Sequence, residues 1–244
     1  MSKLNLKAKE RIIFALDVST LDEVERWVDL LKDHIGAFKV GKQLFTACGP
    51  TVLDAVQEKG GNIFLDLKFH DIPNTVAGAI RETQRPGIIM IDIHALGGYD
   101  MMAAAREAVE SFEGDGKPKL LAVTVLTSLN KESLNDIGID KEPMEMVLKL
   151  SALAKRAGLD GVIASSLEAQ AIRKEMGDDF LIVTPGIRPA VRETGDQKRV
   201  ATPRDAIDNG ADYLVIGRPI RKSPDPVATV KDITEEIERA IGKG

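Results

Sequence analysis

The strongest constraint on the fold of this chain is an alternation, repeated eight times, of short apolar runs and longer segments with helical spacing. The apolar runs occupy residues 11–18, 37–41, 62–68, 88–95, 119–126, 161–165, 181–187 and 213–217. They are continuously apolar, as is typical of parallel strands that are buried on both faces. The segments with helical spacing occupy residues 21–31, 43–59, 75–84, 99–112, 143–157, 167–176, 203–209 and 226–241.

Eight strand–helix units in 244 residues predict an α/β fold of the (β/α)8 TIM-barrel type, with residues 1–244 forming a single domain. A doubly wound open sheet is the alternative, because it requires the same alternation. The connection 130–142 is longer and more polar than the others, so we expect a loop or short helix on the active face of the barrel.

Composition narrows the possible partners. The formal net charge is −5, and a mildly acidic protein is a poor general binder of nucleic acid. Cys48 is the only cysteine, so no internal disulfide can form, which suits a reducing compartment. The first ten residues are polar and precede no signal-peptide core, and runs such as 88–91 are too short to span a bilayer. We therefore expect a cytoplasmic protein with no nucleic-acid or membrane partner.

Polar side chains gather at the carboxyl ends of the predicted strands, where barrel enzymes carry their chemistry. They are Asp17, Lys39, Asp66, Lys68, Asp92, His94, Thr127, Ser128, Ser165, Ser166, Arg188 and Arg218. Charges at the ends of apolar strands cost free energy unless they are paired or used. Their concentration at one end of the barrel predicts an enzyme.

The third strand carries the most distinctive group of charges. Asp66 and Lys68 are two residues apart, so their side chains point to the same face of the strand. Asp71 follows three residues later, and Lys39 on the neighbouring strand can reach the same place. Nearby carboxylates can keep a half-buried lysine protonated, and such a lysine can stabilise a carbanion and deliver a proton. Spacing alone leaves a structural salt-bridge network equally possible.

The seventh and eighth strands run into glycine- and arginine-containing turns, at 184–189 and 217–220. Many barrels bind phosphate at this position, because glycine lets the backbone approach an anion and arginine can hold it with two bonds. Arg188, Gln197 and Arg218 are the candidates. The alternative is that the glycines only form turns and the arginines are solvated, but the position favours phosphate.

The histidines and the cysteine predict no metal site. His34, His70 and His94 are scattered, without the spacing of metal ligands, and Cys48 has no companion. We expect structural roles for His34 and His94, and a bracing role for His70 within its loop. Neither a G-x-G-x-x-G nor a P-loop motif is present, so dinucleotide and P-loop functions have no support.

Residues 64–76, FLDLKFHDIPNTV, closely resemble the signature of the orotidine 5′-monophosphate decarboxylase family. Six more stretches resemble the motifs of that family, in its order: ALD at 15–17, FKVG at 38–41, VLTS at 125–128, VTPGIR at 183–188, GDQKR at 195–199 and IGRPI at 216–220. The resemblance runs from the first strand to the eighth. Leu96 departs from it, since relatives usually carry a smaller residue there.

The resemblance implies the decarboxylation of orotidine 5′-monophosphate to uridine 5′-monophosphate, the last step of de novo UMP biosynthesis, without a cofactor. It implies that Lys68 donates a proton to C6 of the pyrimidine, that Asp66 lies beside the substrate carboxylate, and that Lys39 completes the charge array and touches the ribose.

The same resemblance assigns the remaining site residues. Asp17 would bind ribose hydroxyls, Thr127 or Ser128 the pyrimidine, and Arg188, Gln197, Gly217 and Arg218 the 5′-phosphate, with 188–200 as a loop that closes over it. Asp71 and Thr75 would reach into the site of the partner subunit in a homodimer.

Two other functions remain open at this point. A Mg²⁺-dependent sugar-phosphate decarboxylase or aldolase of the same barrel superfamily would share the D-x-K-x-x-D pattern, but it carries an acidic residue on the second strand, where this chain has Lys39. A non-catalytic phosphate-binding barrel would need only the features of strands seven and eight. The charges Lys39, Asp66, Lys68 and Asp71 count against it, because unused charges cost stability.

Overall fold

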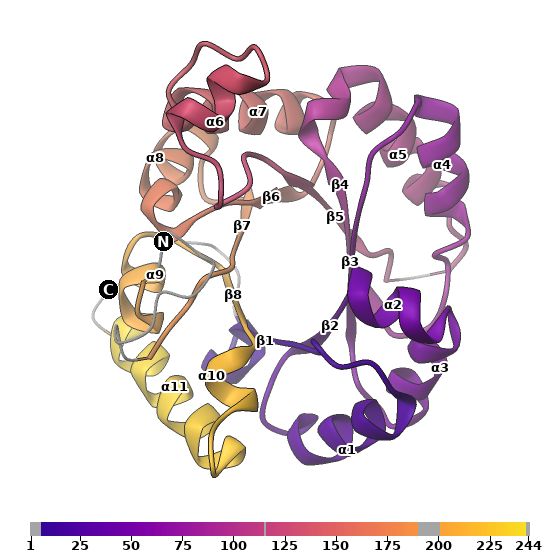
Figure 1. Ribbon diagram of the computed structural model, residues 1–244, viewed down its shortest axis with the longest axis vertical. Helices are drawn as coiled ribbons and strands as arrows, with labels where there is room; N and C mark the ends of the chain where they lie inside the picture. The colour runs from indigo at the N-terminus through magenta and orange to yellow at the C-terminus, as the bar shows by residue number, and fades with distance from the viewer. Residues whose placement is uncertain (1–5, 115, 190–200, 243–244) are drawn as a thin grey trace.

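The computed structural model describes residues 6–114, 116–189 and 201–242. Its eight strands pair in chain order, all parallel, and β8 closes the ring against β1 (Figure 1). The strands are β1 Ile12–Ala15, β2 Ala37–Gly41, β3 Ile63–Phe69, β4 Ile88–His94, β5 Lys119–Val123, β6 Gly161–Ile163, β7 Leu181–Thr184 and β8 Tyr213–Ile216. The closed ring confirms the (β/α)8 barrel and excludes the open sheet.

The helices lie around the outside of the ring (Figure 1). They are α1 Leu21–Leu31, α2 Lys42–Cys48, α3 Thr51–Glu58, α4 Pro73–Arg81, α5 Gly98–Glu110, α6 Lys131–Asp136, α7 Pro143–Arg156, α8 Ser166–Met176, α9 Pro203–Asp208, α10 Arg218–Arg221 and α11 Pro226–Ile241, with 3-10 turns η1 Ala8–Arg11 and η2 Ala95–Gly97. Among the residues that are described, no helix combines the length and the apolar character needed to cross a membrane.

One predicted helix is divided. The segment 43–59 forms α2 and α3, because Gly49 adopts φ +64° and Pro50 follows it. Glycine adopts this left-handed conformation without the steric cost that a Cβ imposes, and proline cannot donate a helical hydrogen bond. The polar connection 130–142 contains the short helix α6, as the sequence predicted.

The core has two layers because successive side chains of a strand point to opposite faces. Ile13 of β1 belongs to the cluster inside the barrel, together with Phe64 and Met90. Phe14 points outward, and its ring centroid lies 5.0 Å from that of Trp27 on α1. The inner cluster supports the floor of the barrel mouth, where the polar strand ends lie.

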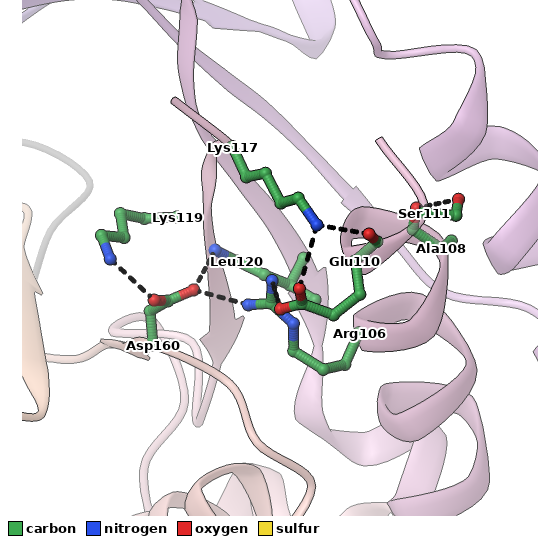
Figure 2. A network of polar contacts seen from close by, with 8 residues as sticks. All are labelled: Arg106, Ala108, Glu110, Ser111, Lys117, Lys119, Leu120 and Asp160. Atoms are coloured by element: carbon green, nitrogen blue, oxygen red, sulfur yellow. Dashed lines mark hydrogen bonds and ion pairs between the residues drawn. The ribbon is translucent and has the colours of Figure 1, made fainter. Parts of the chain in front are cut away.

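The opposite, amino-terminal end of the barrel holds a network of ion pairs (Figure 2). Asp160, just before β6, accepts hydrogen bonds of 2.9 Å from the Leu120 N–H and from Arg106 of α5, and one of 3.0 Å from Lys119. Each bond ties a helix or strand to its neighbour. In (β/α)8 barrels this face serves stability, whereas the opposite face carries the chemistry.

A second aspartate repeats this arrangement before β8. Asp212 is fully buried, and its Oδ2 accepts hydrogen bonds of 2.8 Å from the Ile182 N–H and 2.7 Å from Arg173 of α8. In both places an aspartate at the start of a strand joins the preceding strand to an arginine on the barrel's outer layer. Each aspartate therefore ties two neighbouring strands to a helix at this end of the barrel.

Candidate active site

A cavity of about 330 Å³ opens at the carboxyl ends of the strands, a volume that suits a small-molecule ligand. Eight of the residues predicted from the sequence line it: Asp17, Lys39, Asp66, Lys68, Thr127, Arg188, Gly217 and Arg218. Its other walls are largely apolar, with Phe64, Val123 and Val215 among them. The cavity therefore offers charged groups on two sides and apolar surface between them.

The charges on the β2–β3 side form one alternating chain. Asp66 Oδ2 lies 3.1 Å from Lys39 Nζ, and Asp66 Oδ1 accepts a hydrogen bond from Lys68 Nζ. Lys39 Nζ lies 3.7 Å from Asp17 Oδ1, and Lys68 Nζ lies 3.7 Å from Asp92 Oδ2. Each lysine thus stands between two carboxyl groups, which reduces the cost of holding its charge away from water.

This arrangement keeps Lys68 charged and Asp66 ionised. Burial would lower the pKa of Lys68, but Asp92 and Asp66 outweigh it and raise that pKa above the ordinary value. Burial would raise the pKa of Asp66, but the charges of Lys39 and Lys68 together lower it. A protonated lysine at the cavity wall can act as a general acid.

Asp92 belongs to this array, although no role for it was predicted from the sequence. It is fully buried on β4, and its Oδ1 accepts a 2.7 Å hydrogen bond from the backbone N–H of Lys68. Burial, and then the charge of Asp66, raise the pKa of Asp92 well above its ordinary value. The sequence did carry a sign of such a role. Asp92 is a carboxylate within the apolar run 88–95, and a buried carboxylate needs a partner.

Asp71 and Thr75 lie away from this chain's own charge array. Both are exposed, and Asp71 Oδ1 accepts a 2.6 Å hydrogen bond from the Ile72 N–H. The strand ends at Phe69, so Asp71 no longer follows the alternation that places Asp66 and Lys68. The spacing suggested that Asp71 joins Lys39, Asp66 and Lys68 in one charge array. Within one chain, Asp92 is the carboxyl group beside Lys68 instead.

Lys68 itself has an unusual backbone. With φ +51°, it is the only non-glycine residue in the left-handed region among those described. Leu65 of β3 pairs with Ile91 of β4, and Phe69 pairs with Ile93. Between these pairs β3 has more residues than β4, so β3 bulges here. A residue in this conformation costs about 1–3 kcal/mol and persists only where its surroundings enforce it, most often at functional sites.

The opposite wall of the cavity has the features of an anion site. Gly217 is the N-cap residue before α10, and a Cβ there would lie 3.1 Å from Ala15 Cβ and 3.2 Å from Asp17 Oδ2, so a larger side chain would crowd the cavity. Arg188 and Arg218 line the same wall. Two arginines beside an accessible backbone suit a phosphate group.

The predicted closing loop lies mostly outside the described residues, as does Gln197. Its two ends are joined, since Ile187 and Ala201 form a β-bridge and the Arg188 N–H donates a 2.9 Å bond to the Ala201 carbonyl. The segment therefore leaves and returns at the cavity's phosphate side.

The sequence left open whether Thr127 or Ser128 contacts a ligand. Thr127 lines the cavity, whereas Ser128 is exposed and is absent from its walls.

His70 and His94 stack with ring centroids 5.1 Å apart and an interplanar angle of 19°. This contact supports the bracing role expected for His70. Burial, followed by the charges of His70 and Lys68, lowers the pKa of His94 from 6.5 to about 4.

The described residues contain no group of three or more His, Cys, Asp or Glu side chains that could hold a metal ion. Both oxygens of Asp66 face ammonium groups instead. Lys39 on β2 therefore stands where a metal-dependent relative would carry an acidic residue.

A (β/α)8 barrel with a lysine–aspartate array facing an anion site across one cavity defines an enzyme that acts on a phosphorylated small molecule. The chain belongs to the orotidine 5′-phosphate decarboxylase / HUMPS family, whose profile matches residues 10–233. This membership agrees with the resemblance carried by residues 64–76.

Individual relatives are similar over nearly the whole chain. The orotidine 5′-phosphate decarboxylase of Geotalea daltonii is 55% identical over 95% of this chain and 97% of its own length. That of Geotalea uraniireducens is 54% identical, with 97% and 98% covered. The crystal structure of orotidine 5′-phosphate decarboxylase from Lactobacillus acidophilus has a TM-score of 0.83 and 39% identity, covering 93% of this chain and 98% of that one.

Proposed function

We propose that this chain decarboxylates orotidine 5′-monophosphate to uridine 5′-monophosphate, the last step of UMP biosynthesis, without a cofactor. One observation carries the proposal: the Lys68 ammonium lies between Asp66 and Asp92 at one wall of a cavity whose opposite wall holds Arg188 and Arg218. The family membership and the identity of 52–55% to decarboxylases support the same reaction.

The chemistry requires electrostatic help from the protein. Loss of CO2 from C6 leaves an electron pair at a ring carbon that cannot delocalise it well, and most decarboxylases use a cofactor as an electron sink. Here the Lys68 ammonium stabilises the developing negative charge and then donates its proton to C6. Asp66 stands beside the substrate carboxylate, and Lys39 holds Asp66 in place and contacts the ribose.

The rest of the cavity binds and orients the nucleotide. Asp17 accepts hydrogen bonds from the ribose hydroxyls. The pyrimidine contact of this proposal is Thr127, since Ser128 lies outside the cavity wall. Arg188, Gln197, Gly217 and Arg218 hold the 5′-phosphate, with 188–200 as the segment that closes over it. Binding energy from the phosphate, which does not react, can drive closure and exclude water around the reacting carbon.

The proposed enzyme is a homodimer in which Asp71 and Thr75 complete the partner's site. Both residues are exposed at the start of α4, beside Ile72, which is 66% exposed. Leu96 on η2 and Tyr99 near the start of α5 are further exposed apolar side chains. Clustered exposed apolar side chains commonly mark a protein–protein interface. We further propose that residues 1–244 form one domain and that the protein works in the cytoplasm, where its single cysteine would stay reduced.

An absorbance assay with orotidine 5′-monophosphate tests the reaction. Wild-type protein should consume the substrate, and Lys68→Ala should still bind uridine 5′-monophosphate while turnover falls by roughly 10²–10⁴-fold, the usual contribution of a general acid. Lys174→Ala, on the exposed face of α8, is the matched control and should keep full activity. Near-normal turnover in Lys68→Ala would contradict the role assigned to Lys68.

A further inference from the structure

Asp92 contacts both the backbone and the side chain of Lys68. Its Oδ1 accepts the 2.7 Å hydrogen bond from the Lys68 N–H, and its Oδ2 lies 3.7 Å from Lys68 Nζ. The side chain is 0% exposed, and its strand neighbours Ile91 and Ile93 are fully buried as well. As a carboxylate, its Oδ2 has no hydrogen-bond donor among the described residues.

The backbone around Lys68 needs such a partner. The bulge between Leu65 and Phe69 removes Lys68 from the regular pairing with β4, so its N–H cannot be satisfied by a ladder bond there. Asp92 supplies the acceptor from the side chain of the same neighbouring strand. The bond therefore holds Lys68 at φ +51°, the conformation in which its side chain meets Asp66 at the cavity.

We propose that Asp92 is a positioning residue for Lys68: through its bond to the Lys68 N–H it maintains the strained backbone that aims the Lys68 ammonium at Asp66 and the cavity. The inference rests on the proposed function, in which Lys68 is the proton donor. Asp92 itself does not line the cavity, so it acts through Lys68 and not on the substrate.

The bond to the Lys68 N–H needs an acceptor oxygen and does not need a charge on Asp92. Burial, followed by the charge of Asp66, raises the pKa of Asp92, which favours the protonated form. A proton on Oδ2 still leaves Oδ1 as the acceptor of the Lys68 N–H. An asparagine has the same shape and offers both a carbonyl acceptor and an amide donor.

Two variants separate these requirements. Asp92→Asn keeps the acceptor for the Lys68 N–H and should keep kcat within about threefold, because the amide oxygen can accept the same bond. Asp92→Leu keeps the branching at Cγ but removes the acceptor, and should lower kcat on the order of a hundredfold, as misplacement of a reacting group by about 1 Å can do. KM and the Kd for uridine 5′-monophosphate should stay within about threefold in both variants, since the phosphate wall is untouched.

The results that would overturn the inference are distinct. Full activity in Asp92→Leu would show that Lys68 needs no acceptor, and an equal loss in both variants would show that charge, not the backbone bond, matters.

A measurement on wild-type protein covers the case in which Asp92→Leu does not fold. The Lys68 amide should exchange slowly with deuterium, and rapid exchange would refute the bond. If wild-type protein fails to turn over the substrate, the proposed function fails, and the amide measurement still tests the positioning.

Discussion

Lys39 on β2 and Asp66 on β3 form an ion pair of 3.1 Å at the mouth of the barrel, with side chains only 13% and 10% exposed. The pair joins two neighbouring strands and places a second cation beside the carboxylate that also holds Lys68. A buried carboxylate that loses one of two cationic partners is more costly to keep ionised. Lys39 therefore helps to keep Asp66 ionised beside Lys68.

Replacement of Lys39 should impair catalysis more than folding. Lys39→Met should reduce kcat/KM by about 10²–10³-fold, comparable to the loss of one preorganised electrostatic contact in other active sites. Steady-state assays with orotidine 5′-monophosphate measure this. Lys149→Met, on the exposed side of α7, should show wild-type kinetics. If Lys39→Met is as active as this control, Lys39 lies outside the functional array.

A mixture of two inactive variants tests the proposed sharing of sites. Lys68→Ala and Asp71→Ala subunits, mixed by unfolding and refolding together, should regain about a quarter of wild-type activity. This follows because half of the dimers are mixed and each mixed dimer has one complete site. Each variant refolded alone is the control. Activity that stays at the level of the separate variants would refute the contribution of Asp71 to the neighbouring subunit.

The stacked His94 should make stability depend on pH. Its pKa is about 4 in the folded protein and 6.5 as the ordinary value, so the unfolded chain binds a proton more readily between these values. Stability should therefore fall as the pH drops below about 6.5, with the full loss reached below about 4. The loss should be about 1–2 kcal/mol, after an allowance for solvent near this half-buried ring.

Urea unfolding at pH 7.5 and pH 4.5 measures this dependence. His94→Asn is the matched variant, because its side-chain carbonyl can replace Nδ1 as the acceptor for the Leu96 N–H. The variant should lose less stability than the wild type between the two pH values. An identical pH dependence in the two proteins would exclude His94 as its source.

The amino-terminal end of the barrel should contribute stability without affecting chemistry. Asp212→Ala leaves the buried Arg173 without its 2.7 Å partner and should lower the free energy of unfolding by about 3–5 kcal/mol. The kcat of the folded variant should remain unchanged, as this face lies opposite the cavity. Asp208→Ala removes an exposed pair with Arg204 and should cost less than about 1 kcal/mol. Equal effects of the two substitutions would contradict the bracing role of Asp212.

Chelation separates the proposed enzyme from metal-dependent barrels. Turnover of orotidine 5′-monophosphate should be the same with and without excess EDTA, since ammonium groups surround Asp66. A Mg²⁺-dependent enzyme dialysed against EDTA and assayed in parallel provides the positive control. Loss of activity that added Mg²⁺ restores would favour the metal-dependent alternative.

Local pattern was enough to predict the barrel and most of its cavity. Eight apolar runs interrupted by helical segments leave few architectures, and parallel pairing places every strand's carboxyl end on one face. Residues as distant in the chain as Asp17 and Arg218 could therefore be assigned to one cavity from the sequence, and both line it. The strand ends were predicted less well. The apolar run 119–126 predicted a strand of that length, but β5 ends at Val123. Val125 and Leu126 are apolar because they line the cavity, and not because they belong to the strand.

The relation between β3 and β4 depends on the folded barrel and could not be predicted from local sequence. The sequence determined that Asp66 and Lys68 follow one another on a strand, because a two-residue period is a property of the chain itself. It did not determine the bulge, the left-handed backbone of Lys68 or its bond to Asp92. Register between two strands depends on packing across residues that lie about 24 positions apart, and no local pattern encodes it. The position of the Lys68 ammonium is therefore a product of the closed barrel.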